Sequence, residues 1–375
     1  MRILIAGHTL GPIGGVQAYE RDLASWLLER GHSPIVYATE LGDAARQILG
    51  RTIPVTDDLR SVAAPVDVIH GDSPVETMAA LLHFPNTPAL FVCHGWGSLE
   101  RTTPHFPRIL RYVAVDDTCA DRLLLREAVP PDKLSVLLNA VDVETFRQRA
   151  PLPAEPRRAV VFGNTAHELT FLPAIREACR RRSIDVEVVG AAAGRATPSP
   201  ESILGDYDVA FAKAKCAMEA MACGLAVILC DRAGLGGMVR SAELDRLRRL
   251  NFGMRTLQKP LTTETILEEL ALYDPGDARR VSDRIRETAS SDALHESLLS
   301  LYESVVDEHA RNGSNGDWLA ESRAASAFLH TLAIRERRQE GGMWMLAKAT
   351  QRVLQMPVVG PVGTRLLRWL APERR

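Results

Sequence analysis

The sequence predicts two doubly wound α/β domains that face each other across a cleft, followed by a helical, basic C-terminal extension. Strand-like apolar runs alternate with helix-like segments over most of the chain, and they form two series separated by a proline-rich stretch. Strands that alternate with helices are typical of parallel sheets covered by helices on both faces. The length of 375 residues is also enough for two domains.

The first series spans residues 1–150, the predicted N-terminal domain. Its strand-like runs are "RILIAG" (2–7), "PIVYA" (34–38), "VDVIHG" (66–71), "ALFVCHG" (89–95), "YVAVD" (112–116) and "LSVLLN" (134–139). A helix is expected after the first run, because apolar residues recur there at a spacing that puts them on one stripe: Val16, Tyr19, Leu23, Trp26 and Leu27.

The second series spans residues 151–305, the predicted C-terminal domain. "RAPLPAEPRR" (149–158) lies at its start, before the first strand-like run, and contains three prolines, which suits a linker between domains. The strand-like runs of the second series are "AVVFG" (159–163), "VEVVG" (186–190), "DVAFA" (208–212) and "AVILC" (226–230). In doubly wound sheets ligands bind at the carboxyl ends of the strands, so the functional residues are expected there.

Residues 306–375 form the predicted extension. "NGSNG" (312–316) indicates a break, and a helix is expected at 317–340. From Arg335 to Arg375 nine Lys and Arg stand against three Glu, and they are interleaved with apolar residues: Trp344, Met345, Leu346, Val353, Leu354, Leu366, Leu367 and Trp369. This composition is typical of a segment that touches a membrane surface. It equally suits a helix that packs on the body, crossing back to the N-terminal domain, or on another subunit.

The overall composition is that of an ordinary soluble protein, with 46% apolar and 25% charged residues. A net charge of −2 gives no indication of nucleic acid as a partner. Without a signal peptide or an apolar run near 18 residues, we expect a cytoplasmic protein that reaches the inner face of the membrane only through its tail. No cysteine pair has CxxC spacing, so reduced, buried thiols are favoured over zinc: Cys93, Cys119, Cys179, Cys216, Cys223 and Cys230.

The stretch "FAKAKCAMEAMACGLAVILCD" (211–231) predicts a strand, a short helix and a second strand. Lys213 and Lys215 then lie at the head of the helix, where free backbone N–H groups and the helix dipole favour an anion. Solvated loop lysines remain the alternative. Glu219 lies one turn further along, and a carboxylate there can accept both hydroxyls of a ribose.

Two other features suggest ligand contacts. Gly11, Gly14 and Gly15 do not have GxGxxG spacing, which disfavours a nicotinamide or flavin cofactor, but the adjacent glycines let a ligand approach a helix head. The alternative interpretation of these glycines is a tight turn between strand and helix.

His94 directly follows an apolar run and is expected to face the cleft. The alternative interpretation is a histidine with a structural role. "DYD" (206–208) is interpreted as a solvated strand start rather than a metal site.

With these motifs the chain resembles the family 4 glycosyltransferases, which have the GT-B fold of two Rossmann-like domains. The matching pieces are "GPIGGVQAYERDLASWLLERGHSPIVYA", "FVCHGW", "LLNAVDVETF" and "MEAMACGLAVILCDRAGLGG". The resemblance implies a nucleotide-diphosphate sugar donor held mainly by the C-terminal domain and an acceptor at the N-terminal domain. The acceptor would be a glycan, a lipid-linked molecule or a small molecule. Transfer would proceed without metal or cofactor and with retention at the anomeric carbon, as in polysaccharide biosynthesis.

The resemblance also assigns residues. Glu219 matches the second glutamate of the family's E-x7-E motif, which holds the donor ribose. Gly14 and Gly15 match the glycine loop near the diphosphate, and His94 matches the active-site histidine. Asn139 matches an asparagine at the domain junction that is interpreted as structural.

Two departures make this an atypical member. Phe211 stands where the first glutamate of E-x7-E is expected, and "FGNTAHELTF" (162–171) lacks the usual Arg and Lys pair. Because a diphosphate leaving group needs positive charge, Lys213 and Lys215 are expected to replace that pair.

Two alternatives stay open beside the transferase. An NDP-sugar epimerase of the same fold would need acid and base carboxylates, for which Asp72, Asp116 and Asp117 are the candidates. A non-catalytic partner protein is favoured by the missing basic pair.

Overall fold

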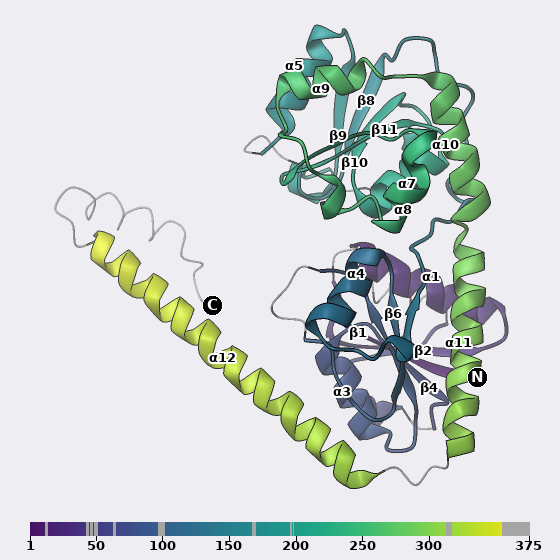
Figure 1. Ribbon diagram of the computed structural model, residues 1–375, viewed down its shortest axis with the longest axis vertical. Helices are drawn as coiled ribbons and strands as arrows, with labels where there is room; N and C mark the ends of the chain where they lie inside the picture. Colours follow the sequence, from purple (N-terminus) through teal and green to yellow (C-terminus); the bar gives the residue numbers. More distant parts are fainter. Residues whose placement is uncertain are drawn as a thin grey trace. The chain divides into compact units, whose positions relative to one another are not determined.

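The computed structural model describes residues 1–354 except 12, 13, 43, 44, 46, 47, 49–51, 63, 64, 97–101, 167–169, 196, 198 and 313–316. The chain divides into two compact units. The first contains Met1–Thr103 and Arg108–Gly316, and the second contains Pro104–Pro107 and Asp317–Arg375. Within the first unit, two separate sheets confirm the predicted pair of doubly wound domains (Figure 1).

The N-terminal domain contains a seven-stranded sheet in the order β3-β2-β1-β4-β5-β6-β7. Every pairing in this sheet is parallel. Its strands are β1 (Arg2–Leu10), β2 (Ser33–Leu41), β3 (Val55–Thr56), β4 (Val68–Gly71), β5 (Ala89–Cys93), β6 (Ile109–Ala114) and β7 (Leu134–Val136). The strand order reverses between β1 and β4, and such a switch point is where open α/β sheets bind ligands.

Among the described residues, the helices α1 (Gly15–Glu29), α3 (Pro74–His83) and α4 (Asp117–Asp121) lie between strands of this sheet. The β1–α1–β2 and β4–α3–β5 connections run in opposite directions along the sheet. Because such crossovers are right-handed, α1 and α3 cover opposite faces. Short 3-10 or π turns complete the domain: η1 (Leu59–Ser61), η2 (Arg122–Arg126) and η3 (Pro131–Lys133).

The C-terminal domain contains a five-stranded sheet in the order β12-β11-β10-β8-β9, in which only the edge strand β12 is antiparallel. Its strands are β8 (Arg158–Phe162), β9 (Asp185–Val189), β10 (Val209–Ala212), β11 (Ala226–Asp231) and β12 (Gly234–Met238). Its helices are α5 (Leu172–Arg181), α6 (Glu201–Leu204), α7 (Ala214–Ala222), α8 (Leu244–Arg249), α9 (Thr263–Leu270) and α10 (Pro275–Thr288), with turns η4 (Ala191–Ala193), η5 (Ser241–Glu243) and η6 (Met254–Thr256).

Two apolar clusters lie on the two faces of the C-terminal sheet. One includes α7 and α10 residues such as Met221 and Ile285, and the other includes α5 and α9 residues such as Ile175 and Ile266. Alternate residues of β10 supply both clusters: Ala210 faces the first and Phe211 the second. The sheet is therefore buried on both sides, as its continuous apolar runs predict.

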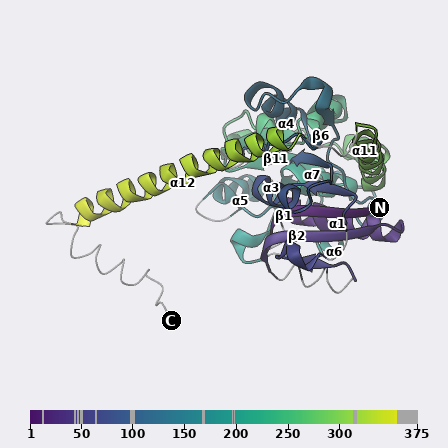
Figure 2. The same ribbon diagram turned by 90° about the horizontal axis from the view of Figure 1, so that it is seen from below.

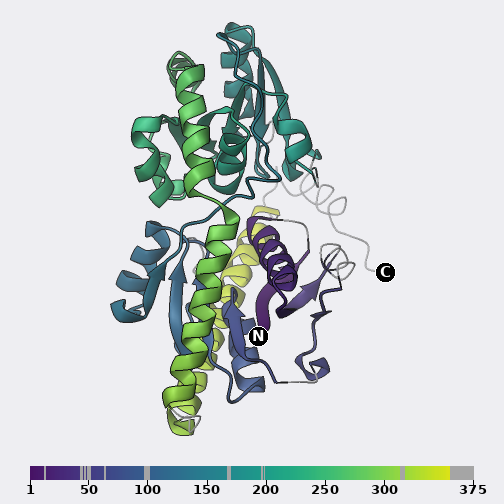
Figure 3. The ribbon, with the colours of Figure 1, turned by 90° about the vertical axis from the view of Figure 1, so that its right-hand side faces the viewer.

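The long helix α11 (Ser291–Asn312) packs against α1, β4 and β5 of the N-terminal domain (Figure 3). Trp26 Nε1 donates a hydrogen bond of 2.8 Å to Asp292 Oδ1. Near the other end, Arg111 Nη2 lies 2.6 Å from Glu308 Oε2. Residues that follow the C-terminal sheet in sequence therefore contribute to the N-terminal domain.

The second unit consists mainly of α12 (Trp318–Leu354), one continuous helix (Figure 2). Asp317 Oδ1 caps it by accepting hydrogen bonds of 3.1 Å from the N–H groups of Leu319 and Ala320. The predicted helix at 317–340 is confirmed, whereas most of the predicted break and the tail beyond Leu354 lie outside the described residues. No described helix is long and apolar enough to span a membrane.

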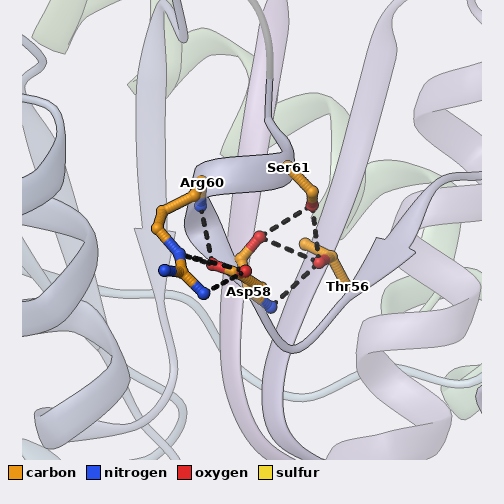
Figure 4. Close-up of polar contacts among 4 residues, drawn as sticks. All are labelled: Thr56, Asp58, Arg60 and Ser61. Carbon is orange, nitrogen blue, oxygen red and sulfur yellow. Dashed lines mark hydrogen bonds and ion pairs between the residues drawn. The ribbon is translucent and has the colours of Figure 1, made fainter.

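A polar turn after β3 closes the far edge of the N-terminal sheet (Figure 4). Asp58 accepts hydrogen bonds from the backbone and the guanidinium of Arg60, while the hydroxyls of Thr56 and Ser61 bond its carbonyl oxygen. The Arg60 bonds lower the pKa of Asp58. The ion pair of Asp58 and Arg60 is largely open to solvent, with 44% and 85% of the side chains exposed, so this turn shapes the edge without adding much to stability.

Candidate functional site

Polar side chains gather at the carboxyl ends of strands in both domains. The N-terminal cluster comprises Tyr19, His70, Asp72, His94 and Tyr302. The C-terminal cluster comprises Thr165, Lys213, Lys215, Glu219 and Asp231. The predicted residues His94, Lys213, Lys215 and Glu219 thus fall into two groups, one per sheet.

His94 directly follows β5, as the sequence predicts for a strand-end residue. Its Nε2 lies 2.8 Å from Oδ1 of Asp72, which directly follows the neighbouring strand β4. The His94 side chain is 7% exposed. The ring of Tyr19 from α1 packs edge-on against it, with the two centroids 4.7 Å apart. These two contacts fix the plane of the His94 ring.

His70 lies inside β4 and is fully buried. Its Nε2 lies 3.1 Å from the same Asp72 oxygen, and its Nδ1 lies 2.6 Å from the hydroxyl of Tyr302 on α11. Burial raises the pKa of Tyr302 well above its usual range, so this phenol is neutral. A continuous chain of hydrogen bonds therefore runs from α11 through β4 to His94.

Asp72 is the centre of this chain. Burial alone would raise the pKa of its carboxyl, but the charges and hydrogen bonds of His70 and His94 outweigh burial and hold the pKa well below its usual range. The carboxylate is therefore ionised. Its second oxygen, Oδ2, is buried without a hydrogen-bond partner among the described residues.

The C-terminal cluster lies where β8, β10 and β11 end side by side. Lys213 follows β10 and its Nζ bonds Asp231 Oδ2 at the end of β11. Thr165, beyond the end of β8, donates a hydrogen bond of 3.0 Å to the other oxygen of Asp231. Hydrogen bonds from Lys213, Thr165 and the backbone of Arg232 outweigh burial and lower the pKa of Asp231.

Lys215 lies in the first turn of α7, as predicted, and contacts a helix of the N-terminal domain. Its Nζ lies 3.4 Å from Asp22 Oδ2 on α1. Both side chains are partly exposed, 27% for Lys215 and 36% for Asp22. An exposed pair at this distance contributes at most about 1 kcal/mol, so a ligand phosphate can replace the Asp22 carboxylate.

Glu219 is 7% exposed, which excludes the ordinary solvated residue that its position could have held. Burial raises the pKa of its carboxyl to about 7, while Lys215 lowers it and Asp22 raises it. It lies on the same element as Lys213 and Lys215. One short helix therefore presents two cations and one buried carboxyl.

Gly14 and Gly15 begin α1, at the switch point of the N-terminal sheet. The N–H of Gly14 donates to Gln17 Oε1 at 3.0 Å, and a Cβ at Gly14 would lie 2.6 Å from that atom. A Cβ at Gly15, in contrast, would meet nothing within 4 Å. A Cβ at Gly14 would displace only the flexible end of the Gln17 side chain, and the described residues leave open space around Gly15, so local packing requires neither glycine.

The two departures from the family motifs have a structural setting. Phe211 is a buried residue of β10, so a carboxylate in its place would lie inside the apolar core. The oxygen Oδ1 of Asn164 accepts a hydrogen bond of 3.2 Å from the N–H of Ala191. Residues 167–169 of the stretch lacking the basic pair lie outside the described residues.

The interpretation of "DYD" as a solvated strand start is wrong. Asp208 is buried and accepts hydrogen bonds from the N–H groups of Arg157 and Arg158 at 2.8 and 3.0 Å. It also pairs with Arg149 Nη1 at 3.0 Å. This carboxylate holds the linker against the C-terminal sheet. Within the part of the chain that the structure describes, no group of three or more His, Cys, Asp or Glu is placed to hold a metal ion.

Two of the carboxylates considered for epimerase chemistry have structural partners. Asp116 caps α4 by accepting a hydrogen bond of 2.6 Å from the N–H of Cys119. Asp117 pairs with Arg249 at 2.7 Å. All six cysteines are free thiols, and all but Cys216 are buried.

Comparison with protein families matches residues 13–145 to the family described as Glycosyltransferase Family 4. This range begins in the loop before α1 and contains Gly14, Gly15, His94 and Asn139. The match covers most of the N-terminal domain and about a third of the chain. Comparison with curated protein sequences finds no match.

Solved structures of similar fold cover about four fifths of the chain. A glycosyltransferase from Rickettsia africae has a TM-score of 0.58 at 14% identity, covering 81% of this chain and 98% of its own. Anabaena Alr3699/HepE in complex with UDP has a TM-score of 0.59 at 12% identity, and the match covers 81% of this chain and 100% of the Anabaena chain. Sucrose-phosphate synthase from Thermosynechococcus elongatus has a TM-score of 0.57 at 13% identity, and the match covers 82% of this chain and 99% of the synthase chain. The chain has the GT-B fold.

The sequence did not single out several partners of the predicted site residues. Asp231 carried a usable signal, because it directly follows an apolar strand as His94 does. Asp22, Tyr19 and Tyr302 carried none, since each lies on a helix among many polar or aromatic residues. Tyr302 meets His70 across 232 residues of sequence.

Proposed function

We propose that this protein is a glycosyltransferase that moves a sugar from a nucleotide-diphosphate sugar to a glycan, lipid-linked or small-molecule acceptor. Transfer proceeds with retention at the anomeric carbon and without a metal ion. The observation that carries the proposal is the head of α7, where Lys213 and Lys215 precede the buried carboxyl of Glu219.

In this proposal the two lysines bind the donor diphosphate and Glu219 binds the ribose hydroxyls. The lysines meet carboxylates, Asp231 and Asp22, in the described structure. A diphosphate supplies the same negative charge, together with contacts to the free N–H groups of the first helical turn. The positive charge then offsets charge that develops on the leaving group, which is the role of the missing basic pair.

The N-terminal domain contributes Gly14, Gly15 and His94. The glycine pair begins α1 at the switch point of its sheet, where little side-chain bulk hinders a ligand. His94 lies at the end of the adjoining strands and acts on the donor sugar or on the leaving phosphate. The acceptor binds on the same domain.

The test is to incubate the protein with a panel of nucleotide sugars and to measure slow hydrolysis of the donor. UDP-sugars come first, because the Anabaena protein of similar fold was solved in complex with UDP. Hydrolysis that is lost in a Lys213→Met, Lys215→Met double variant supports the transferase. Isomerisation of the sugar would indicate an epimerase, and nucleotide binding without either reaction would indicate a non-catalytic partner protein.

The basic tail gives a second, independent part of the proposal: it contacts an anionic membrane surface, which suits a lipid-linked acceptor. Each Lys or Arg near such a surface contributes about 1 kcal/mol. Co-sedimentation with vesicles that contain anionic lipid should fall steeply with added salt and with truncation after Glu340. Equal sedimentation of full-length and truncated chains would refute the contact and leave the transferase untouched.

A further inference from the structure

Two ion pairs join α4 of the N-terminal domain to the end of α8 and to the turn η6 of the C-terminal domain. Arg249 forms two parallel hydrogen bonds to Asp117, of 2.8 Å from Nε and 2.7 Å from Nη2. Arg255 Nη1 lies 2.6 Å from Asp121 Oδ2. In both pairs the acid belongs to the N-terminal domain and the base to the C-terminal domain. We call these four residues the clasp.

The placement of the two acids suits this contact. Asp117 and Asp121 lie four residues apart on α4, so they share one face of the helix. Like charges at this spacing repel each other and destabilise a helix. The two arginines of the other domain offset this repulsion, and the bidentate pair with Arg249 also fixes the direction of the contact. The acidic face of α4 is therefore complementary to the basic segment opposite it.

The segment Arg249–Arg255, which carries both clasp arginines, has a fixed and strained backbone. Asn251 and Phe252 have φ of 55° and 49°, a left-handed conformation that is uncommon for residues with a Cβ and an outlier for a bulky one. Such strain persists only where the surrounding structure enforces it. Phe252 is fully buried in the apolar cluster that also contains α7 residues. Its burial holds the turn in place, so both arginines start from a rigid backbone.

The same segment contacts the head of α7. The N–H of Ala214, between the two lysines, donates a hydrogen bond of 3.1 Å to the carbonyl of Phe252. Lys213 Nζ lies 3.6 Å from Met254 Sδ. One rigid segment thus contacts both the proposed phosphate site and, through its arginines, α4 of the other domain.

We propose that the clasp is a positioning device for transfer: it sets the N-terminal domain against the head of α7, so that His94 meets a donor whose diphosphate is bound there. This inference rests on the proposed function for the identity of the ligand. Domains that share a small polar contact move relative to each other by default. A misplacement of about 1 Å at a reacting centre can lower a rate about a hundredfold. The clasp residues are positioning residues, because they act through the placement of His94.

The clasp is also able to open. Its side chains are between 30% and 61% exposed, so its charges are reached by salt. The Debye length falls from about 10 Å at 0.1 M ionic strength to about 3 Å at 1 M. The contact therefore depends on charge complementarity, and reversal of the charges is its most direct test.

Charge reversal is measured in the full chain. Asp117→Arg and Arg249→Asp each place like charges face to face. Each should lower kcat of donor hydrolysis about tenfold or more, while UDP affinity, which the C-terminal domain provides, stays within about twofold. The combined variant restores the pair with reversed charges and should recover most of the lost kcat. Arg246→Asp is the matched control and should change neither value, because Arg246 on the same helix pairs with Glu243 of its own domain.

Small-angle X-ray scattering gives a second readout that needs no catalysis. The radius of gyration should rise in each single variant and return toward the parent value in the combined variant. It should also rise in the parent between about 0.1 M and 1 M NaCl. A combined variant that remains as extended as the single variants would overturn the inference, and so would single variants with the radius of the parent.

The two readouts separate this inference from the proposed function. If no nucleotide sugar is hydrolysed, the transferase is refuted and scattering decides the clasp. If the parent hydrolyses a donor and the reversals change neither kcat nor scattering, the transferase stands and the clasp is refuted. If Arg249→Asp does not fold, Asp121→Arg and Arg255→Asp repeat the same cycle on the second pair.

Discussion

The N-terminal and C-terminal clusters both lie at the carboxyl ends of parallel strands, yet they differ in burial and in bonding. In the N-terminal cluster, His94 and Asp72 are 7% and 2% exposed and belong to a chain of hydrogen bonds. In the C-terminal cluster, Lys213 and Lys215 are 28% and 27% exposed and pair with carboxylates. Buried hydrogen bonds fix a geometry before any ligand arrives, whereas partly exposed ion pairs are weak and exchangeable.

This difference suggests a division of roles. The N-terminal cluster suits a step that needs a fixed donor, and the C-terminal cluster suits capture and release of a charged ligand. Substitutions in the first should therefore change turnover with little effect on affinity, and substitutions in the second should weaken donor binding as well as hydrolysis.

The largest effect is expected at Gly14 and Gly15, which begin α1 and are proposed to lie next to the ligand. Gly15→Val should abolish transfer and donor hydrolysis while leaving the melting temperature nearly intact, because a Cβ there meets no atom within 4 Å. Gly14→Val tests the same loop: its Cβ would displace only the flexible end of the Gln17 side chain, 2.6 Å away, so it should also change the melting temperature little. Retained activity of Gly15→Val would show that no ligand approaches this loop.

The next largest effect is expected in the N-terminal cluster, at His94. His94→Ala should lower the turnover of donor hydrolysis by about two orders of magnitude or more, the scale of one lost polar group in an active site. The exposed His83 at the end of α3 gives the matched control, His83→Ala, with normal turnover. A folded His94→Ala variant that turns over normally would make His94 a structural residue and remove the basis of the comparison.

A smaller effect concerns Glu219 and pH. Burial raises the pKa of this carboxyl to about 7 in the free protein, and the ionised form is the one that accepts two ribose hydroxyls. Affinity for a nucleoside should therefore fall as pH falls through 7, by about tenfold between pH 8 and pH 6. Calorimetric titration at both pH values should show this in the parent but not in Glu219→Gln, whose binding is weaker and independent of pH. An equal pH dependence in both would assign it to another group.

The smallest effect concerns the backbone between the two lysines. Ala214 has a φ of 53°, a left-handed conformation that costs a residue with a Cβ about 1–2 kcal/mol. Replacing Ala214 by glycine relieves this strain. The greater conformational entropy of glycine in the unfolded chain offsets part of the gain, so Ala214→Gly should stabilise the protein by at most about 1 kcal/mol. Ala220→Gly in the interior of the same helix should instead destabilise it by about 1 kcal/mol. Thermal unfolding compares the two, and a lower melting temperature for Ala214→Gly would contradict the strain.

The sequence predicted the elements whose signals are local. The alternating apolar runs identified both sheets, and the residues after β5 and β10 identified His94 and Lys213 as strand-end groups. The contact partners of these residues could not be predicted from the sequence, because the partners come from distant parts of the chain. Asp22 meets Lys215 across 193 residues, and α11 returns Tyr302 to β4. Burial of Asp208 was missed for a similar reason, since its partners belong to the linker.

The central claim is that the head of α7 binds the donor diphosphate. Calorimetric titration with UDP and with uridine tests it in the parent, in each single lysine variant and in the Lys213→Met, Lys215→Met double variant, with Lys133→Met as the control. A charge-assisted hydrogen bond contributes roughly 1.5–3 kcal/mol, so each single variant should bind UDP about tenfold or more weakly and the double variant more weakly still. Uridine binding should not change. A double variant that binds UDP as tightly as the parent would place the phosphate site elsewhere and contradict the account.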